Sequence, residues 1–143
     1  MKTLKQIIET KEIKGLLKIS PTQTVIEALM VMAEYKIGAL LVIDKNKMVG
    51  IVSERDYARE IILHKKSSKE TLVKDIMTKK VLFLQPSDSF EKGLEIMSEK
   101  KIRHIPVLKG NKIIGMVSQG DLVKEMISHQ KDLISQLESF IQN

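Results

Sequence analysis

The feature that most constrains the fold of this 143-residue chain is an internal duplication. Segment 19–62 aligns with segment 84–127 without a gap, and fifteen of the 44 aligned pairs are identical. A match of this extent predicts two copies of one structural unit. The identical pairs include Pro21/Pro86, Leu29/Leu94, Met32/Met97, Lys36/Lys101, Ile37/Ile102, Val42/Val107, Asn46/Asn111, Gly50/Gly115, Val52/Val117, Ser53/Ser118 and Asp56/Asp121.

Both copies begin with the same predicted strand and helix. A short strand, "LLKIS" or "VLFLQ", ends before a proline, and a helix with apolar residues at helical spacing follows. Thr24 with Glu27 forms a capping-box pattern at the start of the first helix. The apolar stripe of that helix comprises Val25, Ile26, Leu29, Met32 and Ala33. The matching places in the second copy are held by Ser89, Phe90, Leu94 and Met97.

A hairpin and a final helix complete each copy. The hairpins read "ALLVID", "KNK", "MVGIVS" and "HIPVLK", "GNK", "IIGMVS", with Asn at the turn, where a positive φ costs least. The final helices start at Ser53 and Ser118. One β-α-β-β-α unit is too small to bury both faces of its sheet. We therefore predict an α+β fold of two such repeats packed with pseudo-two-fold symmetry, plus terminal helices.

The repeats set the expected domain boundaries. We expect an N-terminal helical segment at 1–15, repeat 1 at 16–63, a polar linker with a short helix at 64–77, repeat 2 at 78–127 and a C-terminal amphipathic helix at 128–143. The apolar residues of that tail can fold back on the module or pack on a partner chain. Because so small a repeat pair often needs more burial than one chain offers, we predict a homodimer.

Composition excludes several classes of function. With no cysteine, the chain has no disulfide, no catalytic thiolate and no cysteine-bound zinc, which agrees with a cytoplasmic location. We expect neither a membrane span nor a signal peptide, because no apolar run approaches ~18 residues and the N-terminal residues mix both charge signs. The net charge of +6 is spread over scattered lysines with few aromatic residues, which favours a solvated basic surface over a nucleic-acid site.

The stretch "GIVSERD" at 50–56 and its twin "GMVSQGD" at 115–121 carry the candidate chemistry. Helix capping alone can explain a Ser that is followed three residues later by an Asp. Glu or Gln would cap equally well, whereas an Asp carboxylate can also accept two hydrogen bonds from a vicinal diol. The N–H groups of the same helix start favour an anion. The capping and binding roles are compatible.

The two signatures behind matching hairpins resemble a tandem pair of cystathionine-β-synthase (CBS) domains, a Bateman module. The resemblance covers about 16–127, and "MAEYKIGALLVID", "GIVSERDYARE" and "KIRHIPV" resemble the small stand-alone CBS-pair proteins of bacteria and organelles. It implies binding of AMP, ADP, ATP, NAD(H) or S-adenosylmethionine in clefts between the copies. The signature Asp would hold the ribose hydroxyls, and the Ser region would approach phosphate.

Carried onto this sequence, the resemblance assigns ribose binding to Asp56 and Asp121. The candidates for phosphate contact are Ser53, Arg55, Ser118, Arg103 and His104. The candidates for the adenine pocket are Ile19, Ile37, Gly38, Ala39, Leu84, Ile102 and Pro106, although plain core packing explains at least half of the large apolar ones. Gly120 replaces Arg55 in the second copy, so the two sites are not expected to be equivalent.

An enzyme is not expected. The sequence lacks a GxSxG elbow, a Walker phosphate loop and His pairs at metal spacing, and it indicates no catalytic cofactor or metal. The leading hypothesis is a regulatory module that binds an adenine nucleotide and signals to an unidentified protein. The alternatives are an interaction module without ligand and, with less support, a nucleic-acid-binding protein.

Overall fold

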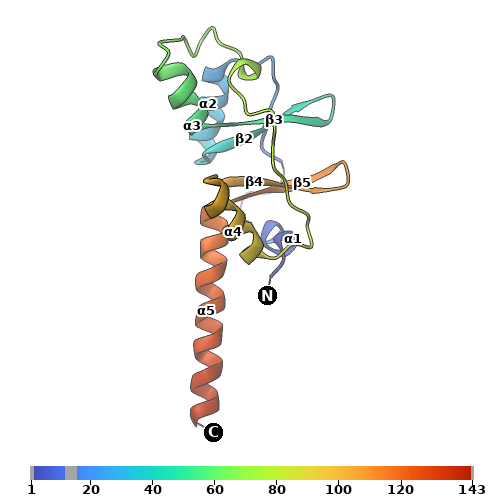
Figure 1. Cartoon of the computed structure of the whole chain (residues 1–143), viewed down its shortest axis with the longest axis vertical. Coiled ribbons are helices and arrows are strands. Elements are labelled where there is room, and N and C mark those ends of the chain that lie inside the picture. Colours follow the sequence, from blue (N-terminus) through green and yellow to red (C-terminus); the bar gives the residue numbers. More distant parts are fainter. Residues whose placement is uncertain (1, 12–15, 143) are drawn as a thin grey trace. The chain divides into compact units, whose positions relative to one another are not determined.

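The computed structural model describes residues 2–11 and 16–142, which form two compact units of mixed helix and strand (Figure 1). One unit comprises Leu16–Val81, and the other comprises Met1–Gly15 with Leu82–Asn143. We call them the repeat-1 unit and the repeat-2 unit. The α+β class and the presence of two repeats are confirmed. Residues 12–15 of the expected N-terminal segment lie outside the described part.

The repeat-1 unit contains a three-stranded sheet in the order β1-β2-β3. Strand β1 runs parallel to β2, and β2 pairs with β3 as an antiparallel hairpin. Its elements are β1 (Lys18–Ile19), α2 (Val25–Tyr35), β2 (Ala39–Asp44), β3 (Lys47–Ser53), α3 (Glu54–Tyr57), a π-helical turn (Ala58–Ile62) and a 3₁₀ turn (Val73–Asp75).

The repeat-2 unit is built around the antiparallel pair of β4 and β5. Helices α1, α4 and α5 pack on and beside this pair (Figure 1). The elements are α1 (Leu4–Glu9), α4 (Phe90–Lys100), β4 (His104–Lys109), β5 (Lys112–Ser118) and α5 (Gln119–Gln142). The predicted C-terminal helix therefore continues without a break from the last helix of the repeat.

The strand expected at "VLFLQ" is reduced to a single bridge between Leu84 and Val107. In the first repeat, the Leu41 amide donates to the Leu17 carbonyl and lengthens the contact with β1. Pro106 occupies the place of Leu41 and has no N–H to donate, so that ladder bond cannot form. Two bonds remain, from Leu84 N to Pro106 O and from Leu108 N to Leu84 O.

Each unit has its own apolar core behind a capped helix. The Thr24–Glu27 capping box is present at the start of α2. At the start of α4, the Ser89 side chain caps the helix, which is one half of such a box. The buried stripe of α2 is Val25, Ala28 and Met32, whereas Ala33 is exposed. The prediction was wrong at Ala33. Helix α2 packs the face formed by residues 25, 28 and 32 on the core, and residue 33 then points outward.

The hairpin turns differ in which residue takes the positive φ. Lys45 and Asn46 both do so in the first turn, as a type I′ turn requires. In the second turn Gly110 has φ 61°, and Asn111 is not among the positive-φ residues. The Asn prediction thus holds for one hairpin only, because a glycine at the first position permits the alternative primed turn.

The segments that precede the two repeats are themselves equivalent, and each packs in the other repeat's unit. In the repeat-2 unit, Leu4 N donates to Asp88 O and Lys5 N to Pro86 O. In the repeat-1 unit, Val73 N and Lys74 N donate to the carbonyls of the two aligned residues, Gln23 and Pro21. Leu4 and Val73 are both fully buried.

Candidate functional site

The first signature places Asp56 in the first turn of α3, directly after β3. The amide and the hydroxyl of Ser53 donate to Asp56 Oδ2 at 2.9 and 3.0 Å, and the Asp56 amide donates to Ser53 Oγ at 3.1 Å. The hydroxyl of Thr78 donates to the other oxygen, Oδ1, at 3.3 Å. The expected cap is therefore present, and the carboxylate is held in one orientation while remaining partly exposed.

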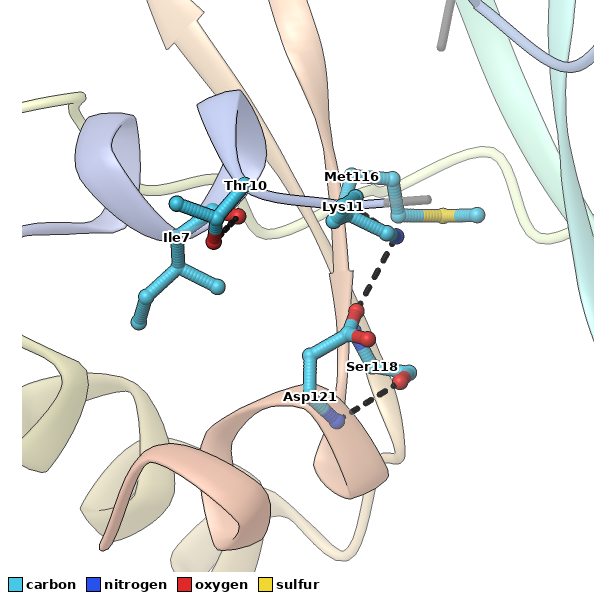
Figure 2. A network of polar contacts seen from close by, with 6 residues as sticks. All are labelled: Ile7, Thr10, Lys11, Met116, Ser118 and Asp121. Atoms are coloured by element: carbon cyan, nitrogen blue, oxygen red, sulfur yellow. Dashed lines mark hydrogen bonds and ion pairs between the residues drawn. The ribbon is translucent and has the colours of Figure 1, made fainter. Parts of the chain in front are cut away.

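The second signature repeats the cap but gives Asp121 a cationic partner. The Ser118 amide donates to Asp121 Oδ2 at 2.8 Å, and the Asp121 amide donates to Ser118 Oγ at 3.1 Å. Lys11 Nζ lies 3.0 Å from the same Oδ2 and also donates to the Met116 carbonyl at 3.0 Å. Figure 2 shows the Lys11 side chain reaching from the segment after α1 across to Asp121. The two signature carboxylates thus differ in their partners, because Asp121 contacts a lysine ammonium group and Asp56 accepts from a threonine hydroxyl.

Backbone pairing brings the predicted hairpin residues to the start of each signature helix. In the repeat-1 unit, Glu54 N donates to Gly38 O at 3.0 Å, and Ala39 lies opposite Ser53. In the repeat-2 unit, Gln119 N donates to Arg103 O at 2.8 Å, and His104 lies opposite Ser118. The predicted phosphate and ribose residues of each repeat therefore lie together within one unit.

Most candidate adenine residues are placed in the cores. Ile19, Ala39 and Leu84 are buried, and Pro106 is buried within β4. Ile37 and Ile102 are half-buried and pack against the cores of their own units. Core packing accounts for these positions, and their contact with a base stays a prediction.

Sequence reasoning missed Lys11 and Thr78. Lys11 comes before the first copy and Thr78 lies between the two copies, so the alignment of 19–62 with 84–127 excluded both. A second alignment, of 4–8 with 73–77, would have pointed to the segments that carry them. It matches Leu4, Ile7 and Ile8 with Val73, Ile76 and Met77.

The same two segments pack against the signature glycines, Gly50 and Gly115. A Cβ on Gly50 would lie 2.8 Å from Met77 Sδ and 2.8 Å from the Thr78 carbonyl oxygen. A Cβ on Gly115 would lie 3.2 Å from Ile8 Cγ2. In both repeats the missing side chain therefore lets a preceding segment approach the second hairpin strand.

No cluster of three or more His, Asp or Glu side chains suited to a metal ion occurs within residues 2–11 and 16–142. In that same part of the chain, no helix has both the length and the apolarity to cross a bilayer.

The sequence profile of the CBS domain matches residues 6–63 and 73–128. The chain belongs to the CBS domain family. Both matched segments include a signature aspartate and the segment that precedes its hairpin.

Relatives with this domain differ widely in overall size. The mitochondrial CBS domain-containing protein CBSX3 of Arabidopsis thaliana is 38% identical over 124 residues, which cover 83% of this chain. The chain spans only 60% of that protein's length. It is also 35% identical over 114 residues to inosine-5′-monophosphate dehydrogenase of Methanocaldococcus jannaschii, but there it spans 22% of the enzyme.

Solved structures of small CBS proteins superpose on nearly the whole chain. A protein with CBS domains from Burkholderia ambifaria has a TM-score of 0.85 at 45% identity, covering 90% of this chain and 96% of that one. The CBS domain pair of protein MJ0100, solved in complex with 5′-methylthioadenosine and S-adenosyl-L-methionine, has a TM-score of 0.78 at 21% identity, covering 90% and 98%. That second likeness shows the shared fold.

Proposed function

We propose that this protein is a regulatory CBS pair that binds an adenosine-containing ligand at its signature helices and signals metabolic state to a protein partner. The observation that carries the proposal is the duplicated placement of Asp56 and Asp121. Each carboxylate sits at the first turn of a helix and is oriented by a backbone N–H three residues earlier. A carboxylate has acceptor capacity for about four hydrogen bonds, which suits a ribose diol.

The surroundings of the signatures support a phosphorylated ligand. Arg55 is next to Asp56 on α3. The Arg103 carbonyl accepts a backbone hydrogen bond from the first residue of α5, beside Ser118. Guanidinium groups pair well with phosphate because they donate two parallel hydrogen bonds. The adenosine compounds bound by the MJ0100 domain pair support the adenosine part of the proposal. The candidate ligands that carry phosphate are AMP, ADP, ATP and NAD(H); S-adenosylmethionine, which has no phosphate, is the fifth candidate.

The two sites are unequal in this proposal. A ribose at Asp56 replaces a hydroxyl contact from Thr78, whereas a ribose at Asp121 has to replace or share the ion pair with Lys11. We expect the Asp56 site to fill at lower ligand concentration. Replacing Lys11 by Met removes the competing charge while keeping the length of the side chain.

Calorimetric titration of the full chain with the five candidate ligands tests the proposal. We expect at least one to bind, Asp56→Asn to weaken the first site tenfold or more, and Lys11→Met to strengthen binding at Asp121. The control is Asp44→Asn, which removes a carboxylate at the exposed end of β2. If none of the five binds at millimolar concentration, the proposal is wrong and the ligand-free interaction module is favoured.

A simpler observation precedes the titration. With no Trp and two Tyr, the protein absorbs weakly at 280 nm, so a co-purified nucleotide raises the 260 to 280 nm ratio visibly. Mass spectrometry of the released compound then identifies it.

Assembly and compartment complete the proposal. We propose a homodimer that acts in the cytoplasm, on the grounds of the small repeat cores and the absence of cysteine. Sedimentation analysis of the purified chain tests the first point.

A further inference from the structure

The second half of α5 exposes a continuous apolar face. Every residue from 130 to 142 is exposed, and Phe140 and Ile141 have 81% and 80% of their surface open to solvent. Figure 1 shows α5 extending beyond α4 and the β4–β5 pair of its own unit. Burying such residues is favourable, so the face needs a covering surface. The other exposed apolar residues of α5 are Met126, Ile127, Leu133, Ile134 and Leu137.

The apolar residues of α5 recur with a seven-residue period over nearly three heptads. A stripe at a and d is the pattern by which helices pair along their length. We call the nine residues at positions a, d and e the α5 stripe, in which Gln130 is the only polar member. With Val123 as position a, the a positions are Val123, Gln130 and Leu137, the d positions are Met126, Leu133 and Phe140, and the e positions are Ile127, Ile134 and Ile141.

The contacts that α5 makes with its own unit lie mainly on a different face, and they cover the stripe only at its start, where Val123 is half-buried. Leu122 is fully buried, Glu125 pairs with Lys2 at 3.4 Å, and the His129 ring meets Phe90 edge-on at 5.9 Å. Leu122, Glu125 and His129 are spaced three and four apart and lie beside the stripe on the helix surface. The unit therefore anchors the first turns of α5 without occupying the stripe beyond Gln130.

Two properties of the α5 stripe point to a second copy of the same helix. In a parallel, in-register pair, Gln130 faces Gln130 of the other copy, and each amide can both donate and accept. In an antiparallel pair an a position faces a d position, which would bury the amide against an apolar side chain. The e and g positions carry no Lys, Arg, Asp or Glu that would oppose pairing of identical helices. Over residues 122–141 those positions hold Leu122, Ile127, His129, Ile134, Gln136 and Ile141.

The apolar area of the α5 stripe is also large enough for a stable interface between two copies. Burying one large apolar side chain removes roughly 60 to 120 Å² from water, as follows from 1.5–3 kcal/mol at about 25 cal/mol/Å². The eight apolar stripe residues therefore offer several hundred Å² per helix. That is comparable with the ~800 Å² per partner of a stable interface.

We propose that two copies of this protein associate through the α5 stripe as a parallel, in-register helix pair with Gln130 at its centre. The pairing does not depend on the ligand proposed above. It assigns the C-terminal helix to assembly and leaves the signature residues at its start available to a ligand.

The lack of cysteine allows a direct test by cross-linking in the full chain. Gln130→Cys places a thiol at a central a position, and Ser135→Cys places one at an f position on the opposite, polar face. Under mild oxidation we expect Gln130→Cys to form a disulfide-linked dimer at least tenfold faster than Ser135→Cys. Equal rates, or no dimer from Gln130→Cys, would overturn the proposal.

A second variant separates the stripe from any other contact between copies. Leu137→Glu, added to Gln130→Cys, should abolish the cross-link, whereas Ser139→Glu on the polar face should leave it unchanged. Both positions are exposed, so circular dichroism should show the helix and the fold retained. Cross-linking that survives Leu137→Glu would show that the stripe is not the interface.

Discussion

Gly50 and Gly115 occupy the same signature position but face obstacles of different kinds. A methyl group at Gly50 would collide with the backbone carbonyl of Thr78, a residue that is fixed by two bonds to Ile51, at 3.0 Å and 2.8 Å. The three atoms nearest to a methyl group at Gly115 would all belong to the side chain of Ile8. A side chain can rotate away, whereas a paired backbone has to be displaced.

We therefore predict that Gly50→Ala lowers the free energy of unfolding by about 1–3 kcal/mol and that Gly115→Ala costs less than about 1 kcal/mol. Urea unfolding followed by circular dichroism measures both. Equal losses, or a larger loss at Gly115, would contradict the assignment of the obstacles.

The Ser–Asp caps could be predicted from sequence because all their hydrogen bonds span three residues. The partners Thr78 and Lys11 could not, because only folding brings these distant segments to the two carboxylates. Net charge gave no hint of the ion pair either, since any of the scattered lysines could have supplied it.

At the scale of elements, two carboxylates with lowered pKa values lie at the starts of α2 and α4. Hydrogen bonds from Gln23 and Thr24 lower the pKa of Glu27. At Asp88, desolvation raises the pKa, but the Gln85 amide and the Lys92 ammonium group outweigh it, so the pKa lies below the ordinary range. A lowered pKa means that the ionised form is favoured in the folded state.

Acid should therefore destabilise the chain through these helix starts. Their contribution is complete above the unfolded pKa values, near 4, and is lost as pH falls through the lower folded values. We expect the thermal melting temperature to fall from about pH 5 towards pH 3, and to fall less steeply in the Glu27→Gln, Asp88→Asn double variant. Asp132→Asn, on the exposed face of α5, controls for charge removal. An unchanged slope in the double variant would contradict the prediction.

Element types were largely predictable because the apolar periodicity and caps are local. The strand at "VLFLQ" was overestimated because its pairing depends on a donor that Pro106 lacks in another strand. The burial of Ala28 rather than Ala33 depended on which face of α2 meets the core, and both residues fit an apolar stripe equally well in sequence.

At the scale of the molecule, each unit is completed by a segment from the other side of the duplication. Leu4 is fully buried in the core of the repeat-2 unit with Phe90, Ile105 and Leu122. Val73 takes the corresponding place in the repeat-1 unit. The duplication indicated the two repeats, but it gave no means of knowing that the preceding segments are exchanged.

Leu4→Ala should therefore loosen residues that are far away in sequence. We expect a loss of about 2–5 kcal/mol for the repeat-2 unit. Hydrogen exchange should quicken across β4 and β5 while β2 and β3 stay protected. Val73→Ala should show the reverse pattern. Faster exchange throughout the chain in both variants would contradict the division into two units.

The exchange of segments also sets the order in which the chain can mature on the ribosome. Residues 16–81 make up the whole repeat-1 unit, so this unit can close as soon as its last residue emerges. Helix α1 is made before that unit, yet its own partners are made after it, and the bond from Lys11 to Met116 spans 105 positions. Leu4 and Ile7 thus stay uncovered while the repeat-1 unit is synthesised and folds. During that time, we expect the exposed apolar side chains of α1 to be the part of the chain that a chaperone binds.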